Sequence, residues 1–236
     1  MPAEGLATEI PDEKRIFWDR REAGRLLAGR LSSYRDQKPI VLALARGGVV
    51  VGYEIARSLG APLDVVVARK LGAPDQPELA LGAIAPGGTY VLNEDILMWL
   101  DISEDELEQI ASRESREMER RVRLFRGDRP EPMLKGKTVI LVDDGIATGM
   151  TVRAAIEHIR QHEPGHLVLA VPVCDAGAAE VLCSEADDLV SLKTPLELLA
   201  IGYWYEDFEQ VSDEEVVEML ERSRRGEVRE PKAHDH

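Results

Sequence analysis

Short runs of consecutive apolar residues recur along this chain, and most are followed by a segment with the apolar spacing of a helix. The runs lie at residues 40–44, 63–68, 138–142, 166–173 and 189–192. A strand that is apolar at every position is buried on both faces, as in parallel sheets covered by helices. Strands that alternate with helices imply βαβ units. We therefore expect an α/β fold, a mostly parallel sheet flanked by helices.

The spacing of apolar side chains also predicts the helices. They are expected at residues 20–34, 49–59, 103–125, 152–159, 176–182 and 212–224. Ser103 and Glu106 match a capping box at the start of the long charged helix. That helix is expected to pack one face on the body, with a dimer contact or the support of a lid as the alternative. A hairpin is predicted from residues 79–84 and 89–92, because Pro86-Gly87-Gly88 lies between them.

The net charge of the chain limits the kinds of molecule that it can bind. The 236 residues include 29 Lys and Arg and 44 Asp and Glu, so the formal net charge is −15. A strongly acidic chain repels phosphate, which argues against nucleic acid or an anionic membrane surface as a partner. An anionic ligand would need a locally basic pocket or a metal ion.

The chain length suggests one domain. We expect it to span residues 1–222, with a disordered tail over 223–236. The start of the chain lacks the basic and apolar regions of a signal peptide, and no apolar run is long enough to span a bilayer. Cys174 and Cys183 are too few for a disulfide framework and are expected to be reduced thiols. These features predict a cytoplasmic protein.

The segment from Val139 to Thr151 carries the strongest functional signal. Four apolar residues lead into Asp143 and Asp144, and a loop with two glycines and two threonines then runs into a helix. Backbone N–H groups, hydroxyls and the positive helix end in such a loop suit a phosphate. The adjacent carboxylates can accept hydrogen bonds from ring hydroxyls. The pattern therefore indicates a sugar phosphate site.

Other motifs are absent. There is no lysine at the Walker position and no G-x-G-x-x-G after the first strand, so neither a P-loop nor a dinucleotide fingerprint is present. No G-x-S-x-G elbow supports a serine hydrolase. His158, His162 and His166 are four residues apart, but residues 163–165 end the helix between the last two. The three histidines cannot share a helix face, so we expect no metal site built from them.

The segment with Asp143 and Asp144 resembles the phosphoribosyl-pyrophosphate motif of the type I phosphoribosyltransferases. The resemblance implies their Rossmann-like fold and a reaction in which a nucleophile displaces pyrophosphate at the anomeric carbon, with Mg²⁺ on the diphosphate. Asp143 and Asp144 would hold the ribose hydroxyls, act in catalysis and meet the metal through the ligand or water. The 5-phosphate would be held by Ala147, Thr148, Gly149, Met150 and Thr151.

Two further segments look like parts of the same binding site. Arg46, Gly47 and Gly48, at the end of the first strand, are similar to the pyrophosphate loop of the family. The resemblance implies a cis peptide bond between Ala45 and Arg46. Arg69 and Lys70, after the second strand, are similar to the basic pair that leads into the family's mobile loop. Together these side chains would supply the local positive charge that the whole chain lacks.

The sequence departs from the family pattern at the general base. Some purine-salvage members carry a third acid in the phosphate loop, where this chain has Ala147. Glu78 is the candidate catalytic substitute, and Asp75 is the other acid considered.

In the family a variable hood covers the nucleophile. The resemblance implies a small hood from the terminal segments, at about residues 1–22 and 193–212. It contains the aromatic residues Tyr203, Trp204 and Phe208, which are candidates for contact with a planar base. Packing of the last helix is the equal alternative for these aromatics. Cys174 and Asp175, just past a strand end, are further candidates to face the site.

These expectations favour a phosphoribosyltransferase, a pentosyltransferase that transfers a phosphoribosyl group from phosphoribosyl pyrophosphate to a nitrogenous base in nucleotide salvage. The sequence does not identify the acceptor base. The alternative is a non-catalytic sensor that binds phosphoribosyl pyrophosphate or a nucleotide on the same fold. A phosphatase or phosphorolytic activity on a ribose phosphate is a third possibility. The resemblance also implies a homodimer.

Overall fold

Five parallel strands form the central sheet of the protein. The computed structural model describes residues 17–226. The strands are β1 (Ile40–Leu44), β2 (Leu63–Val66), β6 (Thr138–Val142), β7 (His166–Val173) and β8 (Asp188–Lys193). They are ordered β2-β1-β6-β7-β8, and every neighbouring pair is parallel. The parallel sheet expected from the apolar runs is confirmed.

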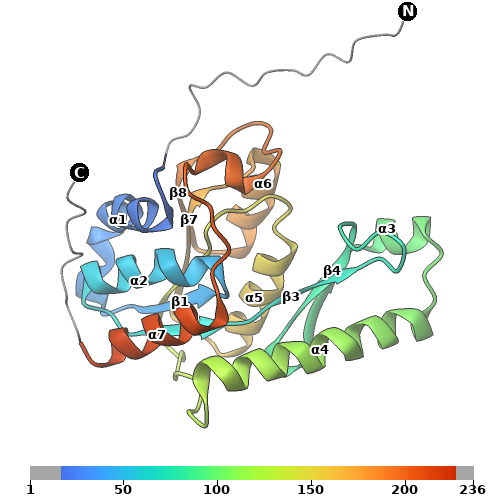
Figure 1. Cartoon of the computed structure of the whole chain (residues 1–236), viewed down its shortest axis with the longest axis horizontal. Coiled ribbons are helices and arrows are strands. Elements are labelled where there is room, and N and C mark those ends of the chain that lie inside the picture. Colours follow the sequence, from blue (N-terminus) through green and yellow to red (C-terminus); the bar gives the residue numbers. More distant parts are fainter. Residues whose placement is uncertain (1–16, 227–236) are drawn as a thin grey trace, which may run out of the picture.

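Helices cover both faces of this sheet (Figure 1). One face packs against α1 (Arg20–Arg30), α2 (Gly47–Leu59) and α7 (Asp213–Arg224). The other face packs against α5 (Met150–Gln161) and α6 (Ala176–Glu185). Side chains alternate between the faces, because successive strand residues point to opposite sides. Ile140 and Val142 of β6 belong to the first layer, whereas Val139 and Leu141 belong to the second.

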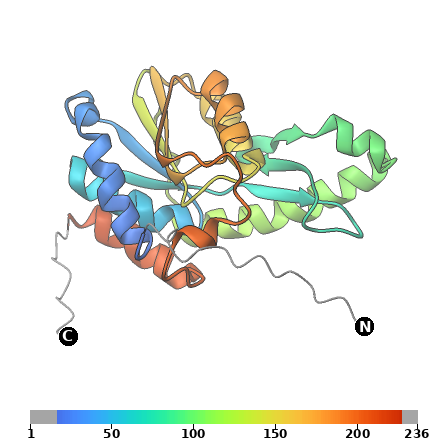
Figure 2. The ribbon, with the colours of Figure 1, turned by 90° about the horizontal axis from the view of Figure 1, so that it is seen from above.

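A second, antiparallel sheet extends to one side of the first (Figures 1 and 2). It contains β3 (Arg69–Gly72), β4 (Ala80–Ala85) and β5 (Thr89–Leu92), with η3 (Pro86–Gly88) in the turn. The predicted hairpin is confirmed, while β3 is an addition to the prediction. α3 (Glu94–Trp99), which was also not predicted, follows β5 and precedes the long helix α4 (Glu104–Arg126).

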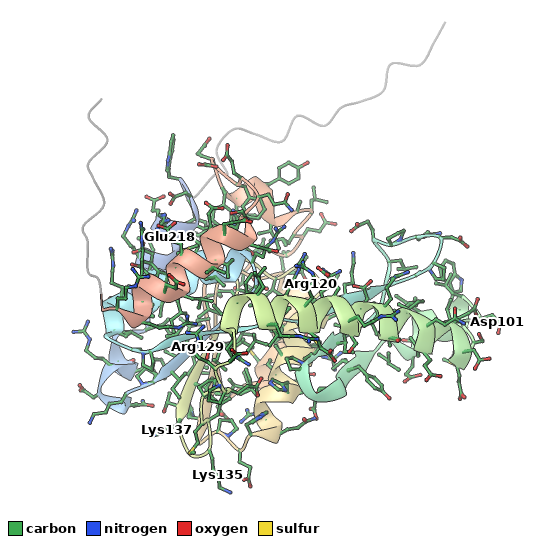
Figure 3. The ribbon with its side chains drawn as sticks, turned by 60° about the horizontal axis from the view of Figure 1, so that its bottom comes forward. Asp101, Arg120, Arg129, Lys135, Lys137 and Glu218 are labelled. Carbon is green, nitrogen blue, oxygen red and sulfur yellow. The ribbon has the colours of Figure 1, made fainter. Side chains whose placement is uncertain are left out.

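The long helix α4 begins with the capping box that the sequence indicates. Ser103 and Glu106 bond each other's backbone N–H groups. Ile110, Met118 and Phe125 on one side of α4 are buried, while its other sides carry charged residues. Figure 3 shows Arg120 on the side of α4 that faces α7, where its guanidinium lies 3.8 Å from the Asp213 carboxylate. The prediction that one face of this long helix packs on the rest of the protein is therefore confirmed.

Some boundaries differ from the prediction. The helix expected over residues 20–34 ends at Arg30, and η2 (Ser32–Gln37) follows as a 3-10 helix, because two serines of low helix propensity come next. α7 ends at Arg224, as the apolar spacing predicted, and thus includes the first two residues of the stretch expected to be a tail. Residues 227–236 of that tail, and residues 1–16 of the predicted hood, lie outside the described residues. No helix in the described range combines the length and apolarity needed to cross a membrane.

Candidate functional site

The parallel strands bring the predicted motifs to one edge of the sheet. β1 ends before Arg46, β2 ends shortly before Arg69, and β6 ends directly before Asp143. β1 is hydrogen-bonded to both β2 and β6, and all three run in the same direction. The carboxyl ends of the three strands are therefore adjacent, which is where parallel α/β sheets bind ligands. The Ala45–Arg46 peptide is cis, as the resemblance implied.

Gly47 and Gly48 lie directly against the two acids. A β-carbon on Gly47 would overlap the Asp144 carboxylate. A β-carbon on Gly48 would lie 2.7 Å from the carbonyl oxygen of Val142 and 2.9 Å from the α-carbon of Asp143. Only glycine permits this close approach of two backbone segments. The predicted pyrophosphate loop and the acid pair therefore form one continuous surface.

The two acids occupy different environments. Asp143 Oδ1 accepts a hydrogen bond of 2.8 Å from the backbone N–H of Asp144. Burial, and then the charge of Asp144, raise the pKa of Asp143 well above its ordinary value. A ligand hydroxyl or a cation at this carboxylate would relieve both effects.

Arg20 was not singled out as a site residue from the sequence, yet it binds the acid pair directly. Its Nε donates to Asp144 Oδ2 at 2.6 Å, and its NH1 donates to the carbonyl oxygen of Glu209 at 2.8 Å. The guanidinium also lies 3.7 Å from the ring centre of Phe208. The Tyr205 hydroxyl donates to the backbone oxygen of Asp144 at 2.6 Å. α1 and the segment after η4 (Ile201–Trp204) thus hold the acid pair from outside the motif.

The predicted phosphate loop ends at the beginning of α5. Gly149 precedes the helix with a φ of +76°, a conformation that favours glycine, and no side chain caps the helix. The first N–H groups of α5 are therefore free of a side-chain cap. Thr148 is exposed, whereas Met150 is buried against β4 through Ala83 and Ala85. Met150 thus anchors the loop to the antiparallel sheet by its side chain.

The three predicted cationic residues each face a carboxylate of the chain. Arg46 lies 3.7 Å from Asp213 at the beginning of α7. Arg69 donates to Glu114 of α4 from Nε and NH2, at 3.0 and 2.6 Å. Lys70 donates to Glu78 at 2.9 Å. An anion that binds here would therefore have to replace the carboxylate partners of these three side chains.

A cavity of about 470 Å³ opens beside Ala45. Arg69 and Lys70 line it from β3, and Arg113 and Arg121 line it from α4. Its acidic lining residues are Glu78 and Glu114, so four basic side chains stand against two acidic ones. The charge of its lining matches the locally basic pocket expected for an anionic ligand. Arg113 and Arg121 were not predicted, because the sequence of α4 indicates a solvated helix.

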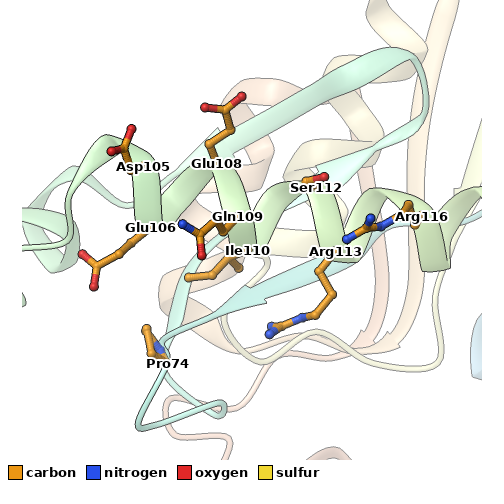
Figure 4. A pocket seen from close by; sticks show the side chains of 9 residues that line it. All are labelled: Pro74, Asp105, Glu106, Glu108, Gln109, Ile110, Ser112, Arg113 and Arg116. Carbon is orange, nitrogen blue, oxygen red and sulfur yellow. The ribbon is translucent and has the colours of Figure 1, made fainter.

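A second cavity, of about 810 Å³, lies farther along α4 (Figure 4). Pro74 lines it from the β3–β4 connection, and the remaining lining residues all come from α4. None of the predicted site residues lines this second cavity.

The candidate acids in the β3–β4 connection are open to solvent. The Glu78 side chain is 99% exposed, and the only side chain among the described residues that its carboxylate pairs with is Lys70. Asp75 is also exposed. The structure therefore places Glu78 at the rim of the basic cavity and not in contact with the acid pair.

Two of the predicted hood aromatics, Trp204 and Phe208, pack in a cluster with Tyr205, which is buried. Tyr205 packs against Phe17 and Phe208, with ring centres 5.4 and 5.0 Å apart. Tyr203 is exposed, while Trp204 and Phe208 are half-buried. The backbone N–H of Phe17 donates to the carbonyl oxygen of Trp204 at 3.1 Å, so the two terminal segments meet. A cavity of about 590 Å³ lies along residues 200–209, where Tyr203 and Phe208 line it.

Cys174 and Asp175 follow β7 next to the phosphate loop. Cys174 is buried, which raises the pKa of its thiol to about 12. Asp175 caps α6 by accepting from the N–H groups of Gly177 and Ala178, and its own N–H donates to the carbonyl oxygen of Ile146. Their role in this geometry is to fix the loop to the end of β7.

Comparisons with known proteins show which family the chain resembles in sequence and in fold. A family model described as "Phosphoribosyl transferase domain" matches residues 18–195. Two curated Mycobacterium tuberculosis proteins, "Putative phosphoribosyl transferase MT0597" and "Putative phosphoribosyl transferase Rv0571c", are each 43% identical over 211 residues, which is 89% of this chain. The chain spans about half of their length, 48%. The solved structure of the Thermus thermophilus protein TT1426 is 44% identical, with a TM-score of 0.73 over 87% of this chain and 97% of that one.

Proposed function

The chain belongs to the phosphoribosyl transferase domain family and has its type I, Rossmann-like fold, and from this premise we propose that it transfers a phosphoribosyl group from phosphoribosyl pyrophosphate to a nitrogenous base. One observation carries the proposal furthest. Gly47 and Gly48 pack against Asp143 and Asp144 without an intervening side chain, so one ligand can contact both segments. A ligand with a sugar between two phosphate groups fits such a surface.

Each part of phosphoribosyl pyrophosphate is assigned a place in this proposal. The ribose hydroxyls donate to Asp143 and Asp144. The 5-phosphate accepts from the uncapped N–H groups of residues 147–151, helped by the positive end of α5. The diphosphate extends over Gly47 and Gly48, beside Arg46, toward the basic cavity that Arg69 and Lys70 line. The three cationic side chains exchange their carboxylate partners for phosphate oxygens.

The acid pair also fits the magnesium ion that the family implies. Carboxylate oxygens are the donors that Mg²⁺ prefers, and Asp143 would gain from a nearby cation because its charged form is disfavoured. In the proposal Asp143 and Asp144 hold Mg²⁺ through the ligand or water. When bound, the ion supplies charge neutralisation on the diphosphate.

Group transfer in this proposal is a displacement at the anomeric carbon. The bond from that carbon to the diphosphate oxygen breaks, and pyrophosphate leaves with the electron pair. A nitrogen of the base supplies the pair for the new bond and loses its proton. Positive charge develops on the ribose ring as the bond breaks, and the two carboxylates lie where they can stabilise it.

The acceptor is proposed to bind beside the hood segment. Tyr203, Trp204 and Phe208 offer aromatic surface near the cavity along residues 200–209. Glu78 is the candidate acceptor of the base proton. It lies in the connection between β3 and β4, so it would reach the base only if that connection moved over the ligand.

Calorimetric titration with phosphoribosyl pyrophosphate, with and without Mg²⁺, tests the binding part. We expect a micromolar dissociation constant, equivalent to roughly −8 kcal/mol, that improves with Mg²⁺. The variant with Asp143→Asn and Asp144→Asn should lose this binding, whereas Asp187→Asn, outside the site, should keep it. Failure of the wild-type protein to bind under either condition would remove the proposal.

Pyrophosphate release in the presence of candidate nucleobases tests the chemistry. Release that the double variant loses would establish the transferase. Tight binding with no release from any base would instead identify a sensor on the same fold. Release of inorganic phosphate alone, or phosphorolysis of a nucleotide, would identify the third alternative.

We also propose that the protein is located in the cytoplasm, a reducing compartment, and that it forms a homodimer. In such a compartment Cys174 and Cys183 would remain thiols. Light scattering at several protein concentrations would measure the assembly directly.

A further inference from the structure

Glu131, His158 and His162 form a cluster that the proposed function does not use. Glu131 belongs to the segment after α4, which in Figure 3 runs between the labelled Arg129 and Lys135. His158 and His162 lie one helical turn apart at the end of α5. One potential ligand atom from each of the three residues lies within 4.8 Å of the other two. The sequence did not reveal this set, because Glu131 is remote from the histidines in the chain.

Two of the three distances in the cluster are close to those between ligands of a tetrahedral metal ion. Glu131 Oε2 lies 3.7 Å from His158 Nε2 and 3.4 Å from His162 Nε2. Two ligand atoms that each bind Zn²⁺ at about 2.0–2.1 Å lie about 3.4 Å apart in a tetrahedral arrangement. The imidazole rings are 4.7 Å apart and meet edge to face, which leaves both Nε2 atoms near the same carboxylate oxygen.

The hydrogen bonding of His162 is compatible with a metal ion at its Nε2. Its Nδ1 lies 2.9 Å from the backbone oxygen of His158, which can only accept, so Nδ1 carries the proton. The lone pair of Nε2 then faces Glu131 Oε2, which is also an acceptor. Either a proton on Nε2 or a metal ion between the two atoms makes this contact attractive. The bond from Nδ1 to a backbone carbonyl is also the outer contact that metal-bound histidines normally make.

Glu131 is prepared to act as a charged ligand. Arg126 NH1 donates to its Oε1 at 2.9 Å, which leaves Oε2 for the cluster. The His158 side chain is only 7% exposed, whereas the His162 and Glu131 side chains are 38% and 35% exposed. Solvent therefore reaches one side of the cluster, where water can complete the coordination.

We propose that Glu131, His158 and His162 bind one divalent transition-metal ion of the Zn²⁺ type, with water as the fourth ligand. Two imidazoles and one carboxylate suit Zn²⁺, Co²⁺ or Ni²⁺ better than Mg²⁺. The site is separate from the acid pair, since His158 lies eight residues, or about 12 Å along α5, beyond Met150. The ion would tie the segment after α4 to the end of α5. This inference does not depend on the proposed transferase activity.

The test is titration of the metal-free chain, residues 1–236, with Zn²⁺ and, separately, with Co²⁺. We expect one high-affinity ion per chain and the visible absorption of four-coordinate Co²⁺. A Zn²⁺ concentration 100 times the dissociation constant should raise the melting temperature by about 5–10 °C. Mg²⁺ at the same concentration should leave the melting temperature unchanged.

Variants locate the ion. His162→Ala and Glu131→Gln should each weaken Zn²⁺ binding at least about 100-fold, since even outer contacts contribute 10–100-fold. His166→Gln is the matched control, because His166 bonds Asp188 instead of the cluster. Cys183→Ser and the double change His234→Ala with His236→Ala control for the exposed thiol and for the terminal histidines. Absence of tight binding in the wild type, or retention of it in both cluster variants, would overturn the proposal.

Discussion

Arg20 and Asp144 are joined by a hydrogen bond of 2.6 Å from Nε to Oδ2, although 124 positions separate them in the chain. Both side chains are largely buried, with 10% and 13% of their surfaces exposed. The guanidinium faces two adjacent carboxylates at the end of β6 and supplies their counter-charge. α1 therefore helps to determine the geometry of a site whose motif lies in β6 and α5.

Arg20→Ala should lower the free energy of unfolding by about 3 kcal/mol, because it leaves a buried carboxylate without its partner. The loss should fall markedly when Asp144 is already Asn, since the neutral side chain has no charge to balance. Urea denaturation of the two single variants and the double variant would measure this coupling.

Arg21→Ala is the control for this prediction. Arg21 is the next residue of α1, is 43% exposed and lies 3.7 Å from Glu54. Its removal should cost no more than about 1 kcal/mol. Equal losses for the two arginine variants would contradict the role assigned to Arg20.

Gly48→Ala should damage both stability and ligand binding. The new β-carbon would meet two backbone groups, the Val142 carbonyl and the Asp143 α-carbon, and neither can move freely. We expect a loss of about 1–3 kcal/mol, as for overpacking elsewhere, and weaker binding of phosphoribosyl pyrophosphate. Gly29→Ala in α1 is the matched control, because no atom lies within 4 Å of its added carbon. That change should stabilise the protein by up to about 1 kcal/mol.

Asp143→Asn should make the protein more stable at neutral pH while removing its proposed activity. The pKa of Asp143 is raised in the folded state, so that state binds more protons than the unfolded one above the ordinary aspartate value. Stability must then fall as the pH rises from that value through the raised pKa. Asn keeps the acceptor for the Asp144 N–H and carries no charge. Between pH 3.5 and pH 8, the melting temperature of the variant should therefore exceed that of the wild type by an amount that grows with pH.

Asp187→Asn is a control for which the expected change in stability has the opposite sign. The pKa of Asp187 is lowered, chiefly by its hydrogen bond to Arg160. Its ionised form stabilises the fold above the ordinary aspartate pKa, and that contribution is lost as the pH falls through the lowered value. The Asn variant should be less stable at neutral pH, with the difference closing on acidification. The same sign for both variants would refute the assignment for Asp143.

The central sheet could be predicted because its strands are buried on both faces. β1, β6 and β7 coincide with the apolar runs at residues 40–44, 138–142 and 166–173. β3 was missed because its sequence, Arg-Lys-Leu-Gly, has no apolar period and owes its conformation to pairing with β4. α3 has six residues, too few for a helical period to emerge.

The residues of the candidate site also fall into a group that the sequence predicts and a group that it does not. Asp143, Asp144 and the phosphate loop are contiguous, so their chemistry can be inferred from the sequence. Arg20 and Arg113 reach the site only through the packing of α1 and α4, which no local pattern encodes. Glu131 illustrates the limit most clearly, since only the tertiary fold places it beside His158.

Glu114→Gln should tighten the binding of phosphoribosyl pyrophosphate. In the free protein Glu114 accepts two hydrogen bonds from Arg69 and lies 3.1 Å from Arg113, so it competes with an incoming diphosphate for these cations. Removing one negative charge from the rim of the basic cavity should improve the dissociation constant about threefold to fivefold. The gain should shrink at higher ionic strength, because salt screens the interaction.

Glu119→Gln is the control on the same helix. Glu119 is 59% exposed, pairs with Arg123 at 3.3 Å and does not line the cavity. It removes the same charge from the chain, so it separates the local effect from the effect of net charge. Calorimetry should then show tighter binding for the Glu114 variant alone. Weaker binding would mean that Glu114 orients Arg69 for the ligand, because the cost of losing that orientation would exceed the electrostatic gain.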